Sequence, residues 1–266
     1  MIINMFYHQL RCYLKKAPKV DGSQILKNVV VSMTTTPPRI NKIWPTLHSI
    51  LRQSQLPSKI YIWIPKKYKR FENTSISKIP DFLTNHPLVQ IEVIDKDWGP
   101  ASKLLPCLQN ILNPEEKIIV IDDDILYYKD MIKDLVSYSN KNPKDAVTTV
   151  GTNIINGAKE KQKYLPTPRS VDIMFGSWGY LVKPSFFSSD IFEYPSSLPE
   201  AFFEDDVWIC GHLKKNEIKK IMLPFHTGKK RGFNLTIDER RSRGLCQFEN
   251  KNGENMSKTW QYFLNP

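Results

Sequence analysis

Three consecutive aspartates, Asp122 to Asp124, directly follow the apolar run 118–121. One aspartate after a strand is ordinary turn chemistry, because its side chain hydrogen-bonds the local backbone. Three adjacent carboxylates repel one another unless a cation or a strong hydrogen-bond network holds them. Mg²⁺ and Mn²⁺ commonly take one or two carboxylates together with phosphate oxygens. The triplet therefore indicates a metal site, and strand alternation predicts Asp122 and Asp124 on one side with Asp123 on the other.

A second acidic group, Glu204-Asp205-Asp206, follows two phenylalanines and opens an apolar helical pattern. Acids at a helix N-terminus cap it and suit its dipole, which is a purely structural explanation. Apolar flanks also raise the pKa of a carboxyl group toward the range useful for a general base. The two interpretations are compatible, because a cap holds a side chain in place. For catalysis we rank Asp205 first and Asp206 second, with Glu204 as the third acid.

Polar segments also follow two other predicted strands. Thr34, Thr35 and Thr36 offer hydroxyl and backbone N–H groups, and Arg39 offers a planar fork for a phosphate or a base. Each of these is also compatible with a simple polar turn.

The segment DWGPASK supplies Asp97, a tryptophan able to stack on a ring, and Lys103. A lysine in the first turn of a helix opposes the helix dipole, which favours a functional purpose for Lys103. His226 runs into three cations at 229–231. A lone histidine is more often structural, but this one is a candidate metal ligand beside a phosphate clamp.

The elements that must position these groups alternate between strands and helices. An alternating order predicts an α/β fold with a mostly parallel central sheet flanked by helices. Ligands bind such sheets beyond the carboxyl ends of the strands, where strand order switches. The helix that contains Lys103 is expected to bury an apolar stripe ending at Leu112. Strands are expected at 25–33, 59–65, 89–95 and 117–121, and helices at 44–54, 101–112 and 128–139.

Length, composition and charge limit the possible class of protein and its partners. The chain has 266 residues, of which 41% are hydrophobic and 11% aromatic, so it can bury a sizeable core and is unlike a disordered chain. The 38 basic residues exceed the 27 acidic residues by 11, which suits either a solvated surface or an anionic partner. We expect an N-terminal extension at 1–24 and a single domain at 25–266 with an irregular C-terminal half.

Four cysteines without a CxxC pair indicate a reducing compartment and no zinc site of the usual spacing. No apolar run reaches the roughly 18–20 residues needed to cross a bilayer. The first 16 residues mix large apolar side chains with Arg and Lys. Two interpretations of them stay open: a helix packed on its own domain, or a peripheral contact with an anionic membrane surface. We therefore expect a cytoplasmic protein, with the inner face of a membrane as the alternative.

The order of these segments resembles bacterial and viral glycosyltransferases with the GT-A fold, close to family 2, over about Val29 to Leu213. Each segment alone is short and common, whereas their order on the right elements is specific. The resemblance implies a GT-A, Rossmann-like sheet with a nucleotide-sugar half at 25–130 and an acceptor half at 131–266. The segments are VVVSMTTTPPRI, WPTLHSILRQSQLPSKIYIWIP, DWGPASKLLP, IIVIDDDILY, FGSWGY and FFEDDVWICGHL.

The resemblance also implies ligands and residue roles. The donor would be a nucleoside diphosphate sugar, most commonly a UDP-sugar, with Mn²⁺ or Mg²⁺, and the acceptor a glycan or a lipid-linked glycan. By motif position Asp124 would bind the metal, Asp122 the ribose or the metal shell, and His226 would be a late metal ligand. Asp205 would deprotonate the acceptor hydroxyl. The expected nucleotide-sugar contacts are Thr34, Thr35, Thr36, Arg39, Asp97, Lys103, Asp122, Asp123 and Gly176.

One base and no obvious second nucleophile predict inversion at the anomeric carbon. The chain departs from the family where many members have a Gly-Gly pair and this one has Ser177-Trp178. Two rival functions remain. A haloacid-dehalogenase-type phosphatase also ends an apolar strand in DxD, although its motif normally lies on an early strand. A basic nucleic-acid-binding protein fits the net charge, but here the basic residues are scattered and carboxylates cluster at strand ends.

Overall fold

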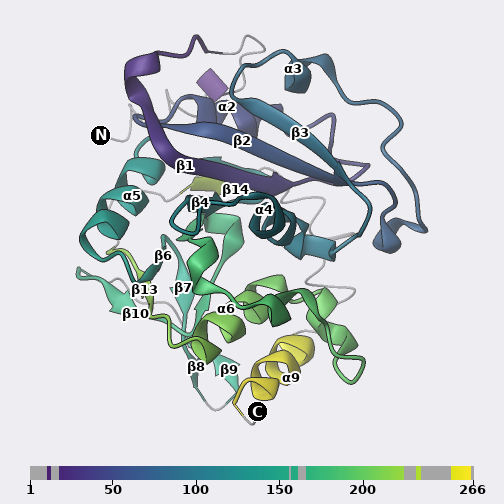
Figure 1. The fold of residues 1–266 in the computed structure, drawn as a ribbon, viewed down its shortest axis with the longest axis vertical. Helices are drawn as coiled ribbons and strands as arrows, with labels where there is room; N and C mark the ends of the chain where they lie inside the picture. The colour runs from purple at the N-terminus through teal and green to yellow at the C-terminus, as the bar shows by residue number, and fades with distance from the viewer. Residues whose placement is uncertain are drawn as a thin grey trace.

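The computed structural model describes residues 11–12, 18–155, 157–160, 166–224 and 253–264, together with the backbone of 232–234. An eight-stranded sheet runs through the molecule with helices on both faces (Figure 1). This architecture confirms the predicted α/β class. Within the described residues, no helix is long and apolar enough to cross a membrane.

The central sheet is mostly parallel. Its strand order is β10-β13-β6-β12-β4-β1-β2-β3. Strands β12 and β10 run against the other members of the sheet. The bounds are β1 Ile25–Thr34, β2 Leu56–Pro65, β3 Val89–Ile94, β4 Lys117–Val120, β6 Ala146–Thr148, β10 Arg169–Ser170, β12 Tyr180–Val182 and β13 Lys220–Met222.

Strand order reverses between β1 and β4. From β1 the chain moves outward to β2 and β3, then returns to the other side of β1 as β4. Because β1 and β4 are parallel neighbours, with Ser32 opposite Val120, their carboxyl ends open at the same edge. This is the switch point at which α/β sheets bind ligands.

Both faces of the sheet are buried, and successive side chains along a strand pack on opposite faces. Val29, Val31 and Met33 of β1 pack in one hydrophobic cluster, and Val30 packs in the other. A strand covered on both sides needs an almost continuous apolar sequence, which is why β1 and β2 are recognisable from composition. The first cluster also includes α2 (Trp44–Leu51) and α5 (Met131–Lys141).

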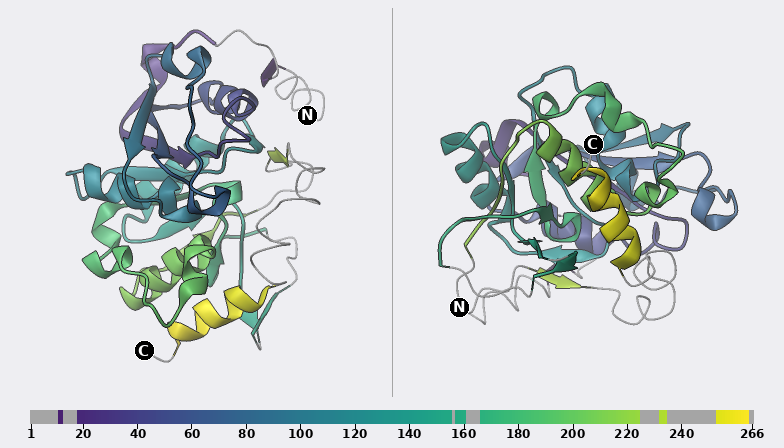
Figure 2. Two further views of the ribbon diagram at one scale, coloured as in Figure 1. Left: turned by 90° about the vertical axis from the view of Figure 1, so that its right-hand side faces the viewer. Right: turned by 90° about the horizontal axis from the view of Figure 1, so that it is seen from below.

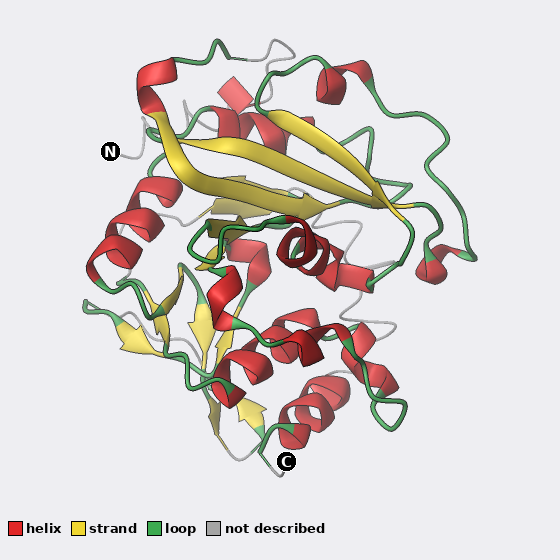
Figure 3. Ribbon diagram, viewed as in Figure 1, coloured by secondary structure: helices red, strands yellow, loops and turns green. Residues whose placement is uncertain are grey.

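The second face is covered by α4 (Leu105–Asn110), α6 (Asp205–Lys215) and α9 (Glu254–Tyr262). Helix α9 packs against α6 (Figure 2). Within the described residues, short strands outside the central sheet form three two-stranded sheets (strands are yellow in Figure 3). They are β5 Ile125–Tyr127 with β14 Gly232–Asn234, β7 Gly151–Thr152 with β11 Ile173–Met174, and β8 Ile154–Ile155 with β9 Ala158–Lys159.

The prediction of one helix at 101–112 was wrong at both ends. Gly99–Lys103 forms a 3₁₀ helix, η3, and α4 begins only at Leu105. Ile111 is already extended, so the chain leaves the helix before Leu112, which is 93% exposed instead of buried. The break at Leu104 between the two short helices fits Pro100 and Pro106, because each proline lies in the first turn of its own helix.

Candidate active site

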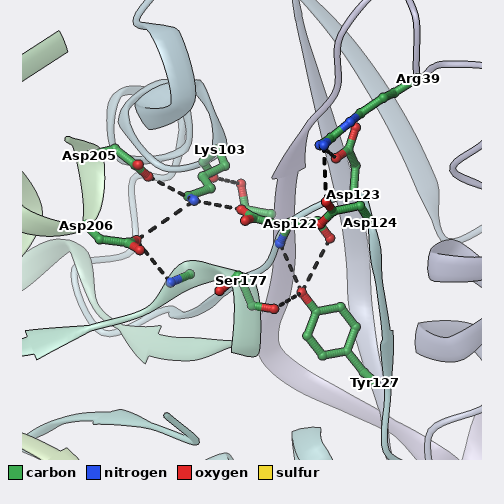
Figure 4. Close-up of polar contacts among 11 residues, drawn as sticks. Arg39, Lys103, Asp122, Asp123, Asp124, Tyr127, Ser177, Asp205 and Asp206 are labelled. Atoms are coloured by element: carbon green, nitrogen blue, oxygen red, sulfur yellow. Dashed lines mark hydrogen bonds and ion pairs between the residues drawn. The ribbon is translucent and has the colours of Figure 1, made fainter. Parts of the chain in front are cut away.

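The first half of the site forms where the loop after β1 meets the aspartate triplet after β4. Arg39 Nη1 donates to Asp123 Oδ1 at 2.7 Å, and Nη2 donates to Asp124 Oδ2 at 3.1 Å (Figure 4). The hydroxyl of Thr35 donates to Asp123 Oδ2 at 2.6 Å. The parallel pairing of β1 and β4 therefore joins residues more than 80 positions apart in the sequence.

The three aspartates do not alternate as a strand would require. Strand β4 ends at Val120, and the chain turns at Asp123 and Asp124. Those two side chains share Arg39, whereas Asp122 lies toward Lys103 (Figure 4). The predicted division, with Asp122 and Asp124 on one side, was wrong because the strand ends before the triplet begins.

Asp123 is a structural acid within this arrangement. Burial raises the pKa of its carboxyl to about 6, although Arg39 and Thr35 oppose the shift. Its backbone carbonyl also accepts a hydrogen bond from the Thr46 hydroxyl at 3.0 Å. Asp123 therefore ties the loop after β1 and the start of α2 to the end of β4.

The second half of the site forms at the N-terminus of α6. Asp205 and Asp206 are the first residues of this helix, as expected from the sequence. Asp206 Oδ1 accepts a hydrogen bond from the Gly176 N–H at 3.0 Å. Glu204 occupies the N-cap position, but its side chain makes no capping hydrogen bond. The capping interpretation of the acids was therefore wrong for Glu204.

Lys103 joins the two halves. Its ammonium lies 2.7 Å from Asp122 Oδ1, 2.9 Å from Asp205 Oδ2 and 3.9 Å from Asp206 Oδ1 (Figure 4). The residue is only 3% exposed. The Ser32 hydroxyl of β1 fixes the backbone of Lys103, because it donates a hydrogen bond to the Lys103 carbonyl at 2.6 Å.

Three carboxylates facing one ammonium leave the cluster with an excess of negative charge. Burial alone would lower the pKa of Lys103, but Asp122, Asp205 and Asp206 together raise it well above the usual range, so Lys103 is charged. Burial first, and then Asp205, raises the pKa of Asp206 to about 8. Burial also raises the pKa of Asp205. At neutral pH we therefore expect Asp206 to carry a proton.

Glu204 lies next to this cluster and is also buried. Burial, and then the charge of Asp205, raises its pKa to about 7. Its Oε1 is buried and has no hydrogen-bond partner among the described residues. Glu204 therefore changes charge near neutral pH and has a buried oxygen without a hydrogen-bond partner in the described part of the chain.

Tyr127 belongs to the site although the sequence analysis did not select it. Its hydroxyl accepts a hydrogen bond from the Asp122 N–H at 3.0 Å and lies 3.1 Å from the Ser177 carbonyl, to which it donates. It thereby fixes the start of the triplet against the segment that replaces the Gly-Gly pair. Its place five residues after Asp122, in an apolar strand, was the only sequence signal.

The other predicted site residues, Thr34, Thr36 and Asp97, form hydrogen bonds with backbone groups. The hydroxyl of Thr34 donates to the Trp63 carbonyl at 2.8 Å, and the Thr36 carbonyl accepts a bond from the Arg39 N–H at 2.9 Å. Asp97 is buried and accepts bonds from the N–H groups of Lys69 and Gly99 at 2.7 and 2.8 Å. His226 and the cations at 229–231 lie outside the described residues.

A cavity of about 420 Å³ lies beside the loop that carries Arg39. Its walls include Pro37, Ile40 and Asn41, which flank Arg39 in sequence. Residues 75–78, 80 and 81 close the other side. The volume falls at the lower end of the range for small-molecule sites, about 300–1,000 Å³.

Among the residues that the structure describes, no three acidic, histidine or cysteine side chains gather around a point that could hold a metal ion. Asp122 and Asp124 nevertheless supply two hard oxygen donors. Mg²⁺ and Mn²⁺ often bind through one or two carboxylates and complete their shell with substrate phosphates and water. In this structure Asp122 lies toward Lys103 and Asp124 toward Arg39, so the two oxygens do not converge on one point, and a cation bound by both would require their side chains to turn toward each other.

No protein-family model and no curated protein sequence match this chain. Among solved structures, the crystal structure of S. aureus TarS residues 1–349 matches with a TM-score of 0.50 and 14% sequence identity. The match covers 77% of this chain and 59% of that one, so the chain spans less than two thirds of that structure. TarS has a glycosyltransferase fold, and this chain shares the fold.

Proposed function

We propose that this protein is a glycosyltransferase that moves a sugar from a nucleoside diphosphate sugar to a hydroxyl group of an acceptor. The observation that supports this most strongly is the meeting of two acidic groups at the switch point of the sheet. Asp122 and Asp124 follow β4, Asp205 begins α6, and Lys103 joins Asp122 to Asp205. The glycosyltransferase fold that this chain shares with TarS supports the same proposal.

The donor would bind on the side of the aspartate triplet. Arg39 carries a charged fork beside Asp123 and Asp124, and the cavity next to its loop has room for a nucleoside. Asp122 and Asp124, with His226, would hold Mn²⁺ or Mg²⁺. The cation would neutralise the charge that develops on the departing diphosphate. We infer a UDP-sugar as the donor from the family resemblance.

The acceptor would bind on the side of α6. Asp205 is the base that takes the proton of the attacking hydroxyl group, a role typically worth 10²–10⁴-fold in rate. With one base on the acceptor side, the hydroxyl attacks opposite the leaving group, and the product has the inverted anomeric configuration. A glycan or lipid-linked glycan acceptor suits the net charge of +11, because such lipids carry phosphate. We propose a cytoplasmic location, with peripheral contact to the inner face of a membrane as the alternative.

The test is a panel of nucleotide sugars offered to the full chain with Mn²⁺ and a set of glycan acceptors. We expect acceptor-dependent release of the nucleoside diphosphate and a product of inverted configuration by NMR. Asp205→Asn should still bind the donor while losing transfer, and the exposed Asp95→Asn serves as the matched control. A product with retained configuration would contradict the inverting mechanism.

The same panel separates the rival functions. Phosphate release from simple phosphoesters, without any sugar acceptor, would favour the haloacid-dehalogenase type of enzyme. Salt-sensitive binding of nucleic acid without a metal would favour a nucleic-acid-binding protein. Either result, without sugar transfer, would overturn the proposal.

A further inference from the structure

Lys103 connects the donor side of the site with the acceptor side. It is the side chain that contacts both Asp122, after β4, and Asp205, on α6, within the part of the chain that the structure describes. Its side chain is 4% exposed, so bulk water contributes little to solvating the ammonium. A buried lysine with this many anionic neighbours stays charged and holds its neighbours at fixed distances.

The surroundings of Lys103 are shaped to keep its ammonium in place. Gly176 lies so close that a Cβ atom there would be 2.6 Å from Lys103 Nζ and 3.0 Å from Asp206 Oδ1. Real Cβ atoms essentially never approach that closely, so any larger residue would displace the ammonium or the carboxylate. Ser32 fixes the backbone of Lys103 from the other side. The glycine in FGSWGY thus has a physical reason: it makes room for a lysine from a distant segment.

We propose that Lys103 is a positioning residue that holds Asp205, in its ionised form, at a fixed place relative to the donor-side Asp122. This inference rests on the proposed function, because it assigns Lys103 a part in the same transfer reaction. Lys103 does not touch the substrate in this role, since its ammonium is enclosed by carboxylates. Its effect is exerted through Asp205, which must be ionised to accept the proton of the acceptor hydroxyl.

The charges around Asp205 explain why a fixed cation is needed. Burial raises the pKa of Asp205, and Lys103 opposes that shift most strongly. The backbone N–H of Asp206 also favours the ionised form of Asp205, and Lys159 lowers the pKa of the neighbouring Glu204. The remaining groups that face this cluster are acids, phenols or a thiol. They are Asp122 after β4, Glu204 and Asp206 at the start of α6, Cys210 within α6, Tyr180 of β12 and Tyr194.

The first experiment replaces Lys103 by methionine and measures kcat/KM for transfer as a function of pH. Without the ammonium, the pKa of Asp205 should rise further, so the acidic limb of the profile should move up by about one to three pH units. At pH 7 the rate should fall by about 100-fold or more, in line with loss of a general base, and recover partly at pH 9.

The matched control is Lys183→Met. Lys183 is equally buried, with 4% of its side chain exposed, and it pairs with Glu115 at 2.7 Å, away from the acidic cluster. Lys103→Met should melt at a lower temperature than the wild type, because it leaves buried carboxylates without their cation. Lys183→Met should lose less, because its partner Glu115 is 62% exposed and water can solvate it. The pH profile of transfer should move for Lys103→Met and stay unchanged for Lys183→Met. Equal profiles for the two variants would overturn the role of Lys103.

Gly176→Ala provides a second test in which the charge is kept and only its place changes. The added methyl group should push the ammonium away from Asp205, lower kcat and shift the acidic limb upward by a smaller amount. Gly22→Ala is its control, because a Cβ at Gly22 meets no atom within 4 Å. Gly176→Ala therefore decides the question even if Lys103→Met does not fold. Wild-type rate and profile in a folded Gly176→Ala protein would contradict the proposal.

The wild-type protein separates the two levels of inference. If it transfers no sugar from any nucleotide sugar, the proposed function fails. If it transfers sugar and a folded Lys103→Met protein keeps the wild-type pH profile, the proposed function stands and the role of Lys103 fails.

Discussion

Replacing Asp206 by asparagine should stabilise the protein, and the gain should grow with pH. Asparagine has the shape of a protonated aspartate, and its Oδ1 can still accept the hydrogen bond from the Gly176 N–H. The pKa of Asp206 is raised from 3.8 to about 8, so the folded state binds this proton more tightly than the unfolded state does. Wild-type stability is therefore greatest at low pH and is lost as the pH rises toward 8.

The size of the effect follows from the same shift. From pH 6 to about pH 8 the unfolded chain has already released the Asp206 proton while the folded wild type still holds it, a span of about two pH units below the folded pKa of about 8. At about 1.4 kcal/mol per unit, this costs up to about 3 kcal/mol of unfolding free energy. The Asp206→Asn side chain has no proton to lose. The stability difference between variant and wild type should therefore widen by that amount over this range.

Urea unfolding at pH 6, 7 and 8.5, in the presence of a chelator, measures this difference. Glu204 and Asp123 titrate in both proteins, so only the difference between them reports on Asp206. Asp95→Asn is the control: this side chain is 85% exposed, and its substitution should change stability by less than about 0.5 kcal/mol at each pH. A constant difference between Asp206→Asn and wild type across the range would refute the buried, protonated state of Asp206.

Two further predictions concern the donor side. Mn²⁺ together with a nucleoside diphosphate should raise the melting temperature of the wild type, because a ligand at 100 times its dissociation constant adds about 2.7 kcal/mol to the free energy of unfolding. In the same thermal-shift assay, Asp124→Ala should lose the metal-dependent part of this rise. An unchanged response would exclude Asp124 as a metal ligand. Arg39→Met should destabilise the protein by about 3–5 kcal/mol at pH 8, because it strands the buried Asp123. The loss should shrink at pH 5, below the pKa of Asp123 of about 6, and equal losses at both pH values by urea unfolding would contradict this.

Most strands of the sheet and most of its flanking helices were predictable because each of their sequences fits only one type of secondary structure. Strands β1 and β2 are mainly apolar, β3 alternates apolar and polar residues at the sheet edge, and α2 and α5 have clear helical spacing. The short strands between 146 and 174 were not foreseen. Several have only two residues, too few for a periodic pattern, and β7 is defined by pairing with β11, which comes about twenty residues later.

The chemical types of the site were also predictable, but its internal connections were not. The triplet at 122–124 and the acids at 204–206 were identified from their place after a strand and before a helix. No local pattern indicated that the two groups share one cation, because Lys103 is the last residue of a short, proline-containing 3₁₀ helix and its partners lie in distant segments. Its burial depends on Gly176, which is 73 positions away in the chain and leaves the space that Lys103 fills.

The most direct test of the whole account is a crystal structure of the protein with Mn²⁺ and a non-transferable nucleotide sugar. We expect the diphosphate and the metal beside Asp122 and Asp124, and the anomeric carbon between them and Asp205. A nucleotide sugar bound elsewhere, with these acids still tied only to Lys103 and Arg39, would contradict the central claim that this edge of the sheet is a sugar-transfer site.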